Sequence, residues 1–260
     1  MSLLHKGITF LHFDETYELQ NKLCSYPHEN IDFRHLEHSN LYCEKKTLHH
    51  IKEQLRNRKQ TGVTFIGSGN YHYVSYLLLQ EVAEPFTLIL FDHYSDMDLS
   101  PSRRTTMISC GSWVSFALRN NPLLQKAMII GPSFFQMQSS VSSKVEVFPI
   151  ESTHTVSVNT ILSHIETSTV YMSIDKDVLE PRDAITNWDQ GHMNLSTLLQ
   201  YVHSIKNKTS VHGIDICGEI SPSSTEIFLP EYQEAIIKNE TANEQILKTI
   251  YQTSKDYSHT

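Results

Sequence analysis

Residues 169–181 of this 260-residue chain read TVYMSIDKDVLEP, an apolar run that ends abruptly in acidic residues. Continuous apolar runs of this length are typical of strands buried on both faces of a parallel sheet, because helices cover both faces of such sheets. In open α/β sheets, functional residues gather at the carboxyl ends of the strands. The stretch therefore predicts a buried parallel strand, with Asp175 and Asp177 as candidate functional groups at its end.

Similar β-rich runs occur along the chain and alternate with helix-like segments. The expected strands are 7–13, 31–37, 62–67, 86–92, 126–131, 144–150, 169–175 and 210–217, and the expected helices are 45–59, 72–83, 112–120, 157–166, 194–206 and 231–253. Such alternation is typical of βαβ units around a parallel sheet. Since no internal repeat or linker interrupts residues 1–260, we expect a single three-layer α/β domain with a mostly parallel sheet of about eight strands.

The composition excludes several classes of protein. Hydrophobic residues are 39% and charged residues 19% of the chain, which is ordinary for a globular protein. The formal net charge of −8 argues against nucleic-acid and membrane partners and leaves a small molecule as the expected partner. The four cysteines lack zinc-ribbon spacing and are expected to be reduced. Because neither a signal peptide nor a membrane span is recognisable, we expect a cytoplasmic protein.

Three other expected strands also end in polar clusters. GSGNYH, with His72, follows the strand at 62–67, DHYSDMD follows the strand at 86–92, and Glu219 follows the strand at 210–217. Carboxylates gathered this densely at one edge of a sheet would repel one another strongly, and metal cations are the usual remedy. A set of carboxylates and imidazoles without a thiolate suits Mn²⁺ or Zn²⁺ better than a softer metal.

Each cluster also has a simpler interpretation. A single Asp at the end of a strand more often caps the next helix than binds a metal. GSGNYH, about twenty residues before Asp92, also resembles a dinucleotide-binding fingerprint. However, His72 replaces the third glycine of that fingerprint, and further acids after Asp92 would repel a diphosphate. The coincidence of several clusters at one edge favours the metal site.

Together these clusters resemble the ordered motifs of the arginase superfamily of ureohydrolases, which includes arginases, agmatinases and formimidoylglutamases. The matching segments are GSGNYHYVS at 67–75, LILFDHYSDMD at 88–98, SIDKDVLEP at 173–181 and DICGEISPS at 215–223. The resemblance is strongest from about residue 60 to residue 223. It implies an arginase-like fold and a homo-oligomer.

The resemblance also implies roles for individual residues. The metal ligands would be His72, Asp92, Asp96 and Asp175 at a first site, with Asp92 and Asp175 bridging to a second site that Asp177 completes. Glu219 would hold a cationic guanidinium group, and we expect Asp96 and His93 to take part in catalysis as well. The implied cofactor is Mn²⁺, one or two ions per chain, with Zn²⁺ or another divalent ion as the alternative. The implied reaction is hydrolysis of a linear C–N bond in a guanidino, formimino or related amidine or amide compound by a metal-activated hydroxide.

Two histidines of the family pattern are absent. Tyr94 stands where the second metal's imidazole is expected, and a phenol with an ordinary pKa near ~10 is a poor ligand at neutral pH. The loop ISCGSWVSF at 108–116 has no histidine for proton transfer, a role left to His93 or His192. These departures leave two alternatives open: a mononuclear variant with altered chemistry, or an arginase-fold protein without catalytic activity.

Overall fold

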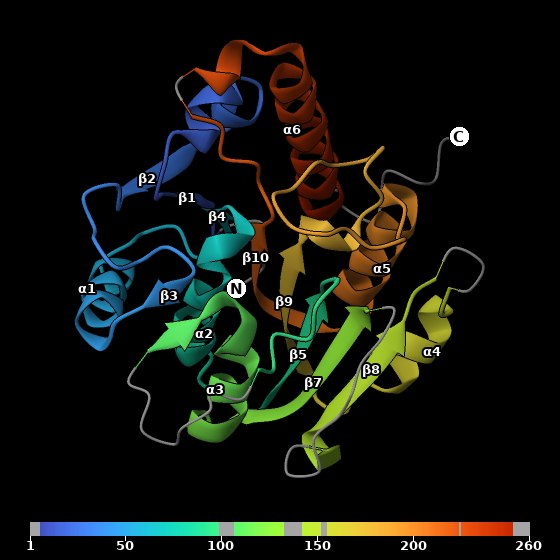
Figure 1. Cartoon of the computed structure of the whole chain (residues 1–260). Helices are drawn as coiled ribbons and strands as arrows, with labels where there is room; N and C mark the ends of the chain where they lie inside the picture. The colour runs from blue at the N-terminus through green and yellow to red at the C-terminus, as the bar shows by residue number, and fades with distance from the viewer. Residues whose placement is uncertain (1–5, 99–106, 133–141, 152–154, 224, 252–260) are drawn as a thin grey trace.

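The computed structural model describes residues 6–98, 107–132, 142–151, 155–223 and 225–251. Within these residues, eight strands form one sheet in the order β2-β1-β4-β10-β9-β5-β7-β8, and every neighbouring pair is parallel. Helices cover both faces of the sheet (Figure 1). The sequence prediction of a single α/β domain built on a parallel sheet of about eight strands is confirmed.

The strands match the expected ones closely, with one exception. They are β1 (Ile8–His12), β2 (His28–Asp32), β4 (Val63–Gly67), β5 (Phe86–Phe91), β7 (Leu124–Gly131), β8 (Val145–Pro149), β9 (Thr169–Asp175) and β10 (Ser210–Cys217). The expected strand at 31–37 was wrong, because β2 ends at Asp32. This edge strand reads HENID and none of its residues is buried, so it lacks the apolar run by which the others were recognised. A small antiparallel pair, β3 (Tyr42–Cys43) and β6 (Ile108–Ser109), was not predicted.

Within the part of the chain that the structure describes, six α-helices flank the sheet. They are α1 (Lys45–Arg56), α2 (Ser75–Leu78), α3 (Trp113–Asn120), α4 (Val158–Ser163), α5 (Leu195–Lys208) and α6 (Pro230–Tyr251). The expected helix at 72–83 is mostly 3₁₀ structure, with η4 (Gly69–Val74) and η5 (Leu79–Glu81) on either side of the four-residue α2. The last two residues of the expected helix at 231–253 lie outside the described residues. Among the described residues, no helix is both long and apolar enough to cross a membrane.

Two apolar cores lie on opposite faces of the sheet. Successive residues of a strand point to opposite faces, so Ile89 and Phe91 belong to one core while Leu88 and Leu90 belong to the other. Helices α4, α5 and α6 contribute to the first core, and α1, α2 and α3 contribute to the second. The central strands are therefore buried on both faces, as their continuous apolar sequences predict.

The strand order decides where functional residues can meet. Strands β4, β10, β9 and β5 are consecutive neighbours in the sheet. Because all of them run in the same direction, their carboxyl ends lie side by side at one edge. The four polar clusters recognised in the sequence follow these same four strands.

Candidate metal centre

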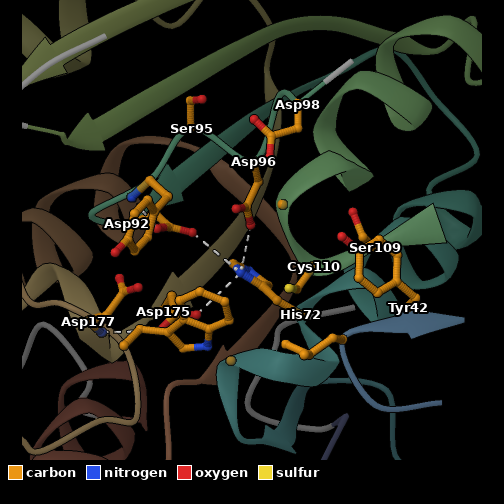
Figure 2. Close-up of a pocket in the computed structure, with 15 residues that line it drawn as sticks. Tyr42, His72, Asp92, Ser95, Asp96, Asp98, Ser109, Cys110, Asp175 and Asp177 are labelled. Carbon is orange, nitrogen blue, oxygen red and sulfur yellow. Dashed lines mark hydrogen bonds and ion pairs between the residues drawn. The ribbon is translucent and has the colours of Figure 1, made fainter. Parts of the chain in front are cut away.

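A buried histidine forms the middle of the polar cluster at this edge. His72 lies in η4, just after β4, and its Nδ1 atom faces three carboxylates (Figure 2). The Nδ1 atom is 3.0 Å from Asp96 Oδ2 and 3.4 Å from both Asp92 Oδ2 and Asp175 Oδ2. The structure thus brings together residues from the loops after three different strands.

The glycine-rich turn before His72 owes its composition to this packing. Gly67 has φ +104°, a conformation that favours glycine. A Cβ atom on Gly69 would lie 2.9 Å from Asp175 Oδ2 and 3.2 Å from Trp188 Cδ1. The glycines therefore allow η4 to approach the acidic cluster, which accounts for them without a dinucleotide.

Backbone N–H groups of the loops at this edge hold the acidic side chains. Asp92 Oδ1 accepts a hydrogen bond from the Tyr94 N–H (2.6 Å), and Asp175 Oδ1 accepts one from the Asp177 N–H (3.0 Å). Asp177 Oδ1 accepts one from the His93 N–H (2.9 Å). Asp92 Oδ2 is buried and makes no hydrogen bond within the described residues. One oxygen of each of these three carboxylates is thus fixed by a backbone N–H group. The buried Asp92 Oδ2 atom, which has no hydrogen-bond partner, faces the centre of the cluster.

A fourth carboxylate is fixed by an aromatic side chain and a strained backbone. Asp96 has φ +50°, which is uncommon for residues other than glycine. Its Oδ2 atom accepts a hydrogen bond from Trp113 Nε1 (2.5 Å) on α3. Such strain persists where the surroundings over-determine it, and it is concentrated at functional sites.

The cluster contains more acidic than basic side chains. Burial, together with neighbouring acids, raises the pKa values of Asp92 and Asp177 well above their ordinary range. Burial alone would lower the pKa of His72, but the adjoining Cys217 and the carboxylates raise it well above its ordinary value. A bound divalent cation would offset the repulsion among these acids. The donor types, their convergence and the unpartnered Asp92 oxygen fit such a cation.

Donor atoms close enough to share an ion fall into three overlapping groups. These are His72, Asp92 and Asp96; Asp92, Asp175 and Asp177; and His72, Asp175 and Cys217, with the donor atoms of each group within 4.8 Å of one another. All five metal ligands expected from the sequence are brought together. The buried thiol of Cys217 is an addition, because the expected donor set contained no sulfur. The sequence did place Cys217 at the end of the expected strand at 210–217. In the structure Cys217 ends β10 and pairs in register with Asp175.

A chain of polar groups supports His72 from behind. Its Nε2 atom lies 2.9 Å from Ser173 Oγ, and Ser173 Oγ donates a hydrogen bond to Asp215 Oδ1 (2.6 Å). Ser75 Oγ donates to the same oxygen (3.0 Å). Since the Ser173 hydroxyl proton points to Asp215, the hydroxyl oxygen accepts from Nε2–H. In the neutral imidazole, the form that would bind a metal ion, this leaves Nδ1 as the lone-pair atom on the side of the carboxylates.

A cavity of about 300 Å³ opens above the cluster. Three aromatic side chains form much of its wall: Tyr42, Tyr94 and Trp188, with exposures of 58%, 37% and 38%. Trp188 Nε1 donates a hydrogen bond to Asn70 Oδ1 (3.0 Å), which fixes its ring at the opening. The other lining residues include Leu41, Ser95, Asp98, Ser109, Cys110 and Gly111. Tyr42 and Trp188 were not predicted from the sequence, because the two-residue strand β3 and the loop that carries Trp188 have no recognisable motif.

Two of the residues expected to be catalytic lie outside this wall. The His93 imidazole is half-buried and does not line the cavity; its loop contributes the backbone N–H that binds Asp177. Glu219 is fully buried and also does not line the cavity. Its carboxylate instead pairs with the Lys176 ammonium and accepts hydrogen bonds from Gln20 and Asn243. The structure therefore brings neither side chain into the cavity.

Comparison with known proteins places these features in context. The sequence profile described as "Arginase family" matches residues 7–227, a match that begins well before the first motif at residue 67. A protein of uncharacterised function from Thermotoga maritima is 34% identical over 161 residues, which is 62% of this chain. The matched part spans 59% of that relative's length.

Solved structures of three hydrolases share the fold. The agmatine ureohydrolase of Thermoplasma volcanium aligns with a TM-score of 0.67 at 12% identity, covering 96% of this chain and 90% of that one. The arginase from Bacillus caldovelox gives 0.65 at 11% identity, with 96% and 99% coverage. The formimidoylglutamase from Bacillus subtilis gives 0.64 at 13% identity, with 94% and 85% coverage.

Proposed function

This chain belongs to the arginase family, and on that premise we propose that it is a metal-dependent hydrolase of a linear C–N bond other than a peptide bond. The observation that carries the proposal is the convergence of the Asp92, Asp96 and Asp175 carboxylates on His72 Nδ1 at the base of an open cavity. Buried acids packed this closely are costly unless a cation accompanies them.

The proposed metal ligands are the five residues expected from the sequence. His72, Asp92 and Asp96 would hold one ion, and Asp177 would complete a second site that shares Asp92 and Asp175. A bound divalent ion, Mn²⁺ in our proposal, supplies Lewis-acid chemistry and lowers the pKa of water. Asp96 lines the same cavity, and its carboxylate would hold the proton of a water molecule bound there.

The remaining residues of the site have orienting roles in this proposal. Ser173 and Asp215 keep the His72 proton on Nε2, so that Nδ1 stays available to a cation. His93 positions Asp177 through its backbone N–H. Tyr42, Tyr94 and Trp188 form apolar walls that exclude water and orient the substrate above the acids.

A mononuclear variant of the hydrolase is the second candidate. Tyr94 replaces an imidazole, and burial together with Asp189 raises the pKa of its phenol to about 12. A phenol that remains protonated at neutral pH is a poor ligand, so the group of Asp92, Asp175 and Asp177 holds carboxylates only. This favours stronger binding of one ion than of two.

The test of the proposed function is hydrolysis by the metal-loaded protein. The full chain is dialysed against Mn²⁺ or Zn²⁺ and assayed for release of ammonia, urea or amine from guanidino, formimino, ureido and amide compounds. We expect turnover of at least one class by the wild type and none by the His72→Asn variant. Turnover that persists in the variant, or none in the loaded wild type, would contradict the proposal and favour a non-catalytic member of the family.

We further propose that the protein is a cytoplasmic homo-oligomer. The exposed apolar side chains of Phe228, Leu229 and Ile237, in and just before α6, support self-association because they offer a contact surface. Light scattering of the purified protein would give a mass above that of one chain. A monomer at micromolar concentration would contradict this part of the proposal.

A further inference from the structure

A buried lysine lies between two of the proposed metal ligands. Lys176 separates Asp175 from Asp177 in the sequence, and its ammonium forms an ion pair with Glu219 Oε1. Both side chains are at most 1% exposed. Lysine and glutamate are almost never this buried unless they are paired, so the pair is a fixed part of the interior.

The remaining hydrogen-bonding capacity of Glu219 is also used. Gln20 Nε2 donates to Oε2 (2.8 Å), and Asn243 Nδ2 donates to Oε1 (2.6 Å). Asn243 Nδ2 also donates to Gln20 Oε1 (2.9 Å), which closes the network. Since Gln20 follows η2 (Thr16–Leu19) and Asn243 lies in α6, the carboxylate is enclosed by distant segments of the chain.

The other two buried carboxylates of the described residues, Asp215 and Glu240, do not line the cavity. Asp215 accepts from Ser75 and Ser173, and Glu240 accepts from the backbone N–H groups of residues 22 and 23. Two bound divalent ions would balance the four aspartates of the metal centre, and the binding test below is therefore made on the fully loaded protein. Asp98 lines the cavity but is exposed, where water weakens ion pairs.

We infer that the reacting group accepted by this cavity is neutral, a linear amide or ureido group, because Lys176 already pairs with Glu219, the buried carboxylate that was expected to hold a cationic group. This inference rests on the proposed function and narrows its substrate class. A guanidinium entering the cavity would lose water without gaining a buried counter-ion, and such a loss is costly. A neutral flat group loses less and packs against the walls of Tyr42, Tyr94 and Trp188.

The test compares three compounds that differ only in the reacting group: N-butylacetamide, N-butylurea and butylguanidinium. Binding to the Mn²⁺-loaded full chain is followed by tryptophan fluorescence, because Trp188 lies at the cavity opening whereas Trp113 is buried. A Trp188→Phe variant assigns the signal. We expect the two neutral compounds to bind with Kd values at least about tenfold lower than that of butylguanidinium.

A second variant tests Lys176 directly. In Lys176→Met the Glu219 charge loses its cation, so the ratio of the two Kd values should move toward butylguanidinium. An unchanged ratio in a variant that circular dichroism shows to be folded would contradict the role of Lys176. If the variant does not fold, the wild-type titration alone decides.

The outcomes separate this inference from the proposed function. Equal or tighter binding of butylguanidinium by the wild type would overturn the inference and indicate cation–π binding by the aromatic walls. No saturable binding of any compound would overturn it as well. Metal content, measured on the same samples, tests the proposed hydrolase independently. If the metal-loaded protein prefers butylguanidinium, only this inference fails. If the protein binds no metal, the proposed function fails.

Discussion

Two buried charged clusters lie beside each other in this molecule, and they are built in opposite ways. The first gathers His72 and four aspartates, three of which face the imidazole, and leaves Asp92 Oδ2 without a hydrogen bond. The second pairs Lys176 with Glu219 and surrounds the carboxylate with amide donors. Lys176 adjoins Asp175 and Asp177, so the two clusters share a loop.

We interpret the first cluster as the candidate site for a cation and the second as a structural cross-link. A buried ion pair whose two charges balance needs no further counter-ion, and breaking it is expensive. An excess of buried carboxylates, one of which has an oxygen without a hydrogen bond, destabilises the metal-free protein. A bound cation would remove this destabilisation. Unequal responses to the removal of one charge should therefore distinguish the two clusters.

The largest effect is expected at the balanced cluster. Glu219→Gln leaves the buried Lys176 ammonium without a counter-ion and should lower the free energy of unfolding by about 3–5 kcal/mol. Urea denaturation of the full chain measures this change. The double variant Lys176→Met/Glu219→Gln, which removes both charges, should recover much of the loss. A single variant as stable as the wild type would show that the pair is not a cross-link.

The next largest effect is expected at the centre of the unbalanced cluster. His72→Asn removes the imidazole that three carboxylates face and should reduce Mn²⁺ affinity by more than about 100-fold, which exceeds the usual effect of losing a supporting residue. Isothermal titration measures the affinity, and circular dichroism serves as the control for folding. An affinity within about threefold of the wild type would exclude His72 as a ligand.

A smaller effect is expected from the groups behind His72. Ser173→Ala removes the hydroxyl that fixes the Nε2 proton and should weaken metal binding by about 10- to 100-fold. Thr is a conservative replacement that keeps the hydroxyl, so Ser173→Thr should retain more of the affinity. Equal losses in the two variants would attribute the effect to packing instead of proton placement.

The smallest effect has the opposite sign. Asp92→Asn removes one charge from the acidic excess, so the metal-free variant should be more stable than the metal-free wild type by about 1 kcal/mol, while Mn²⁺ binds less tightly. Urea denaturation in the presence of a chelator, and again in excess Mn²⁺, separates the two contributions. A less stable metal-free variant would show that the acids are not in excess.

Sequence patterns were sufficient to predict the central sheet and the gathering of acidic side chains at one edge of it, and the reason is physical. An apolar run such as TVYMSI predicts a doubly buried strand, and the parallel arrangement then fixes where Asp175 and Asp177 emerge. The polar edge strand β2 gave no such signal and was misplaced. Here the pattern of burial, rather than residue identity, decided what could be predicted.

Side-chain direction was beyond the sequence. Glu219 follows β10 as expected, yet its carboxylate turns to Lys176, and its other partners, Gln20 and Asn243, are distant along the chain. Tyr42 reaches the cavity from the short strand β3 and Trp188 from a loop, and the positions of both segments depend on packing. The sequence alone can show that a residue follows a strand, whereas the groups that its side chain contacts depend on the whole fold.

Metal stoichiometry tests the central claim most directly. The full chain is dialysed against Mn²⁺, freed of excess ion and measured by elemental analysis, with His72→Asn as the matched control. We expect one or two ions per wild-type chain and at least one fewer in the variant. A folded wild-type protein that retains no metal, or a variant that retains as much as the wild type, would contradict the assignment of the unbalanced cluster as a metal centre.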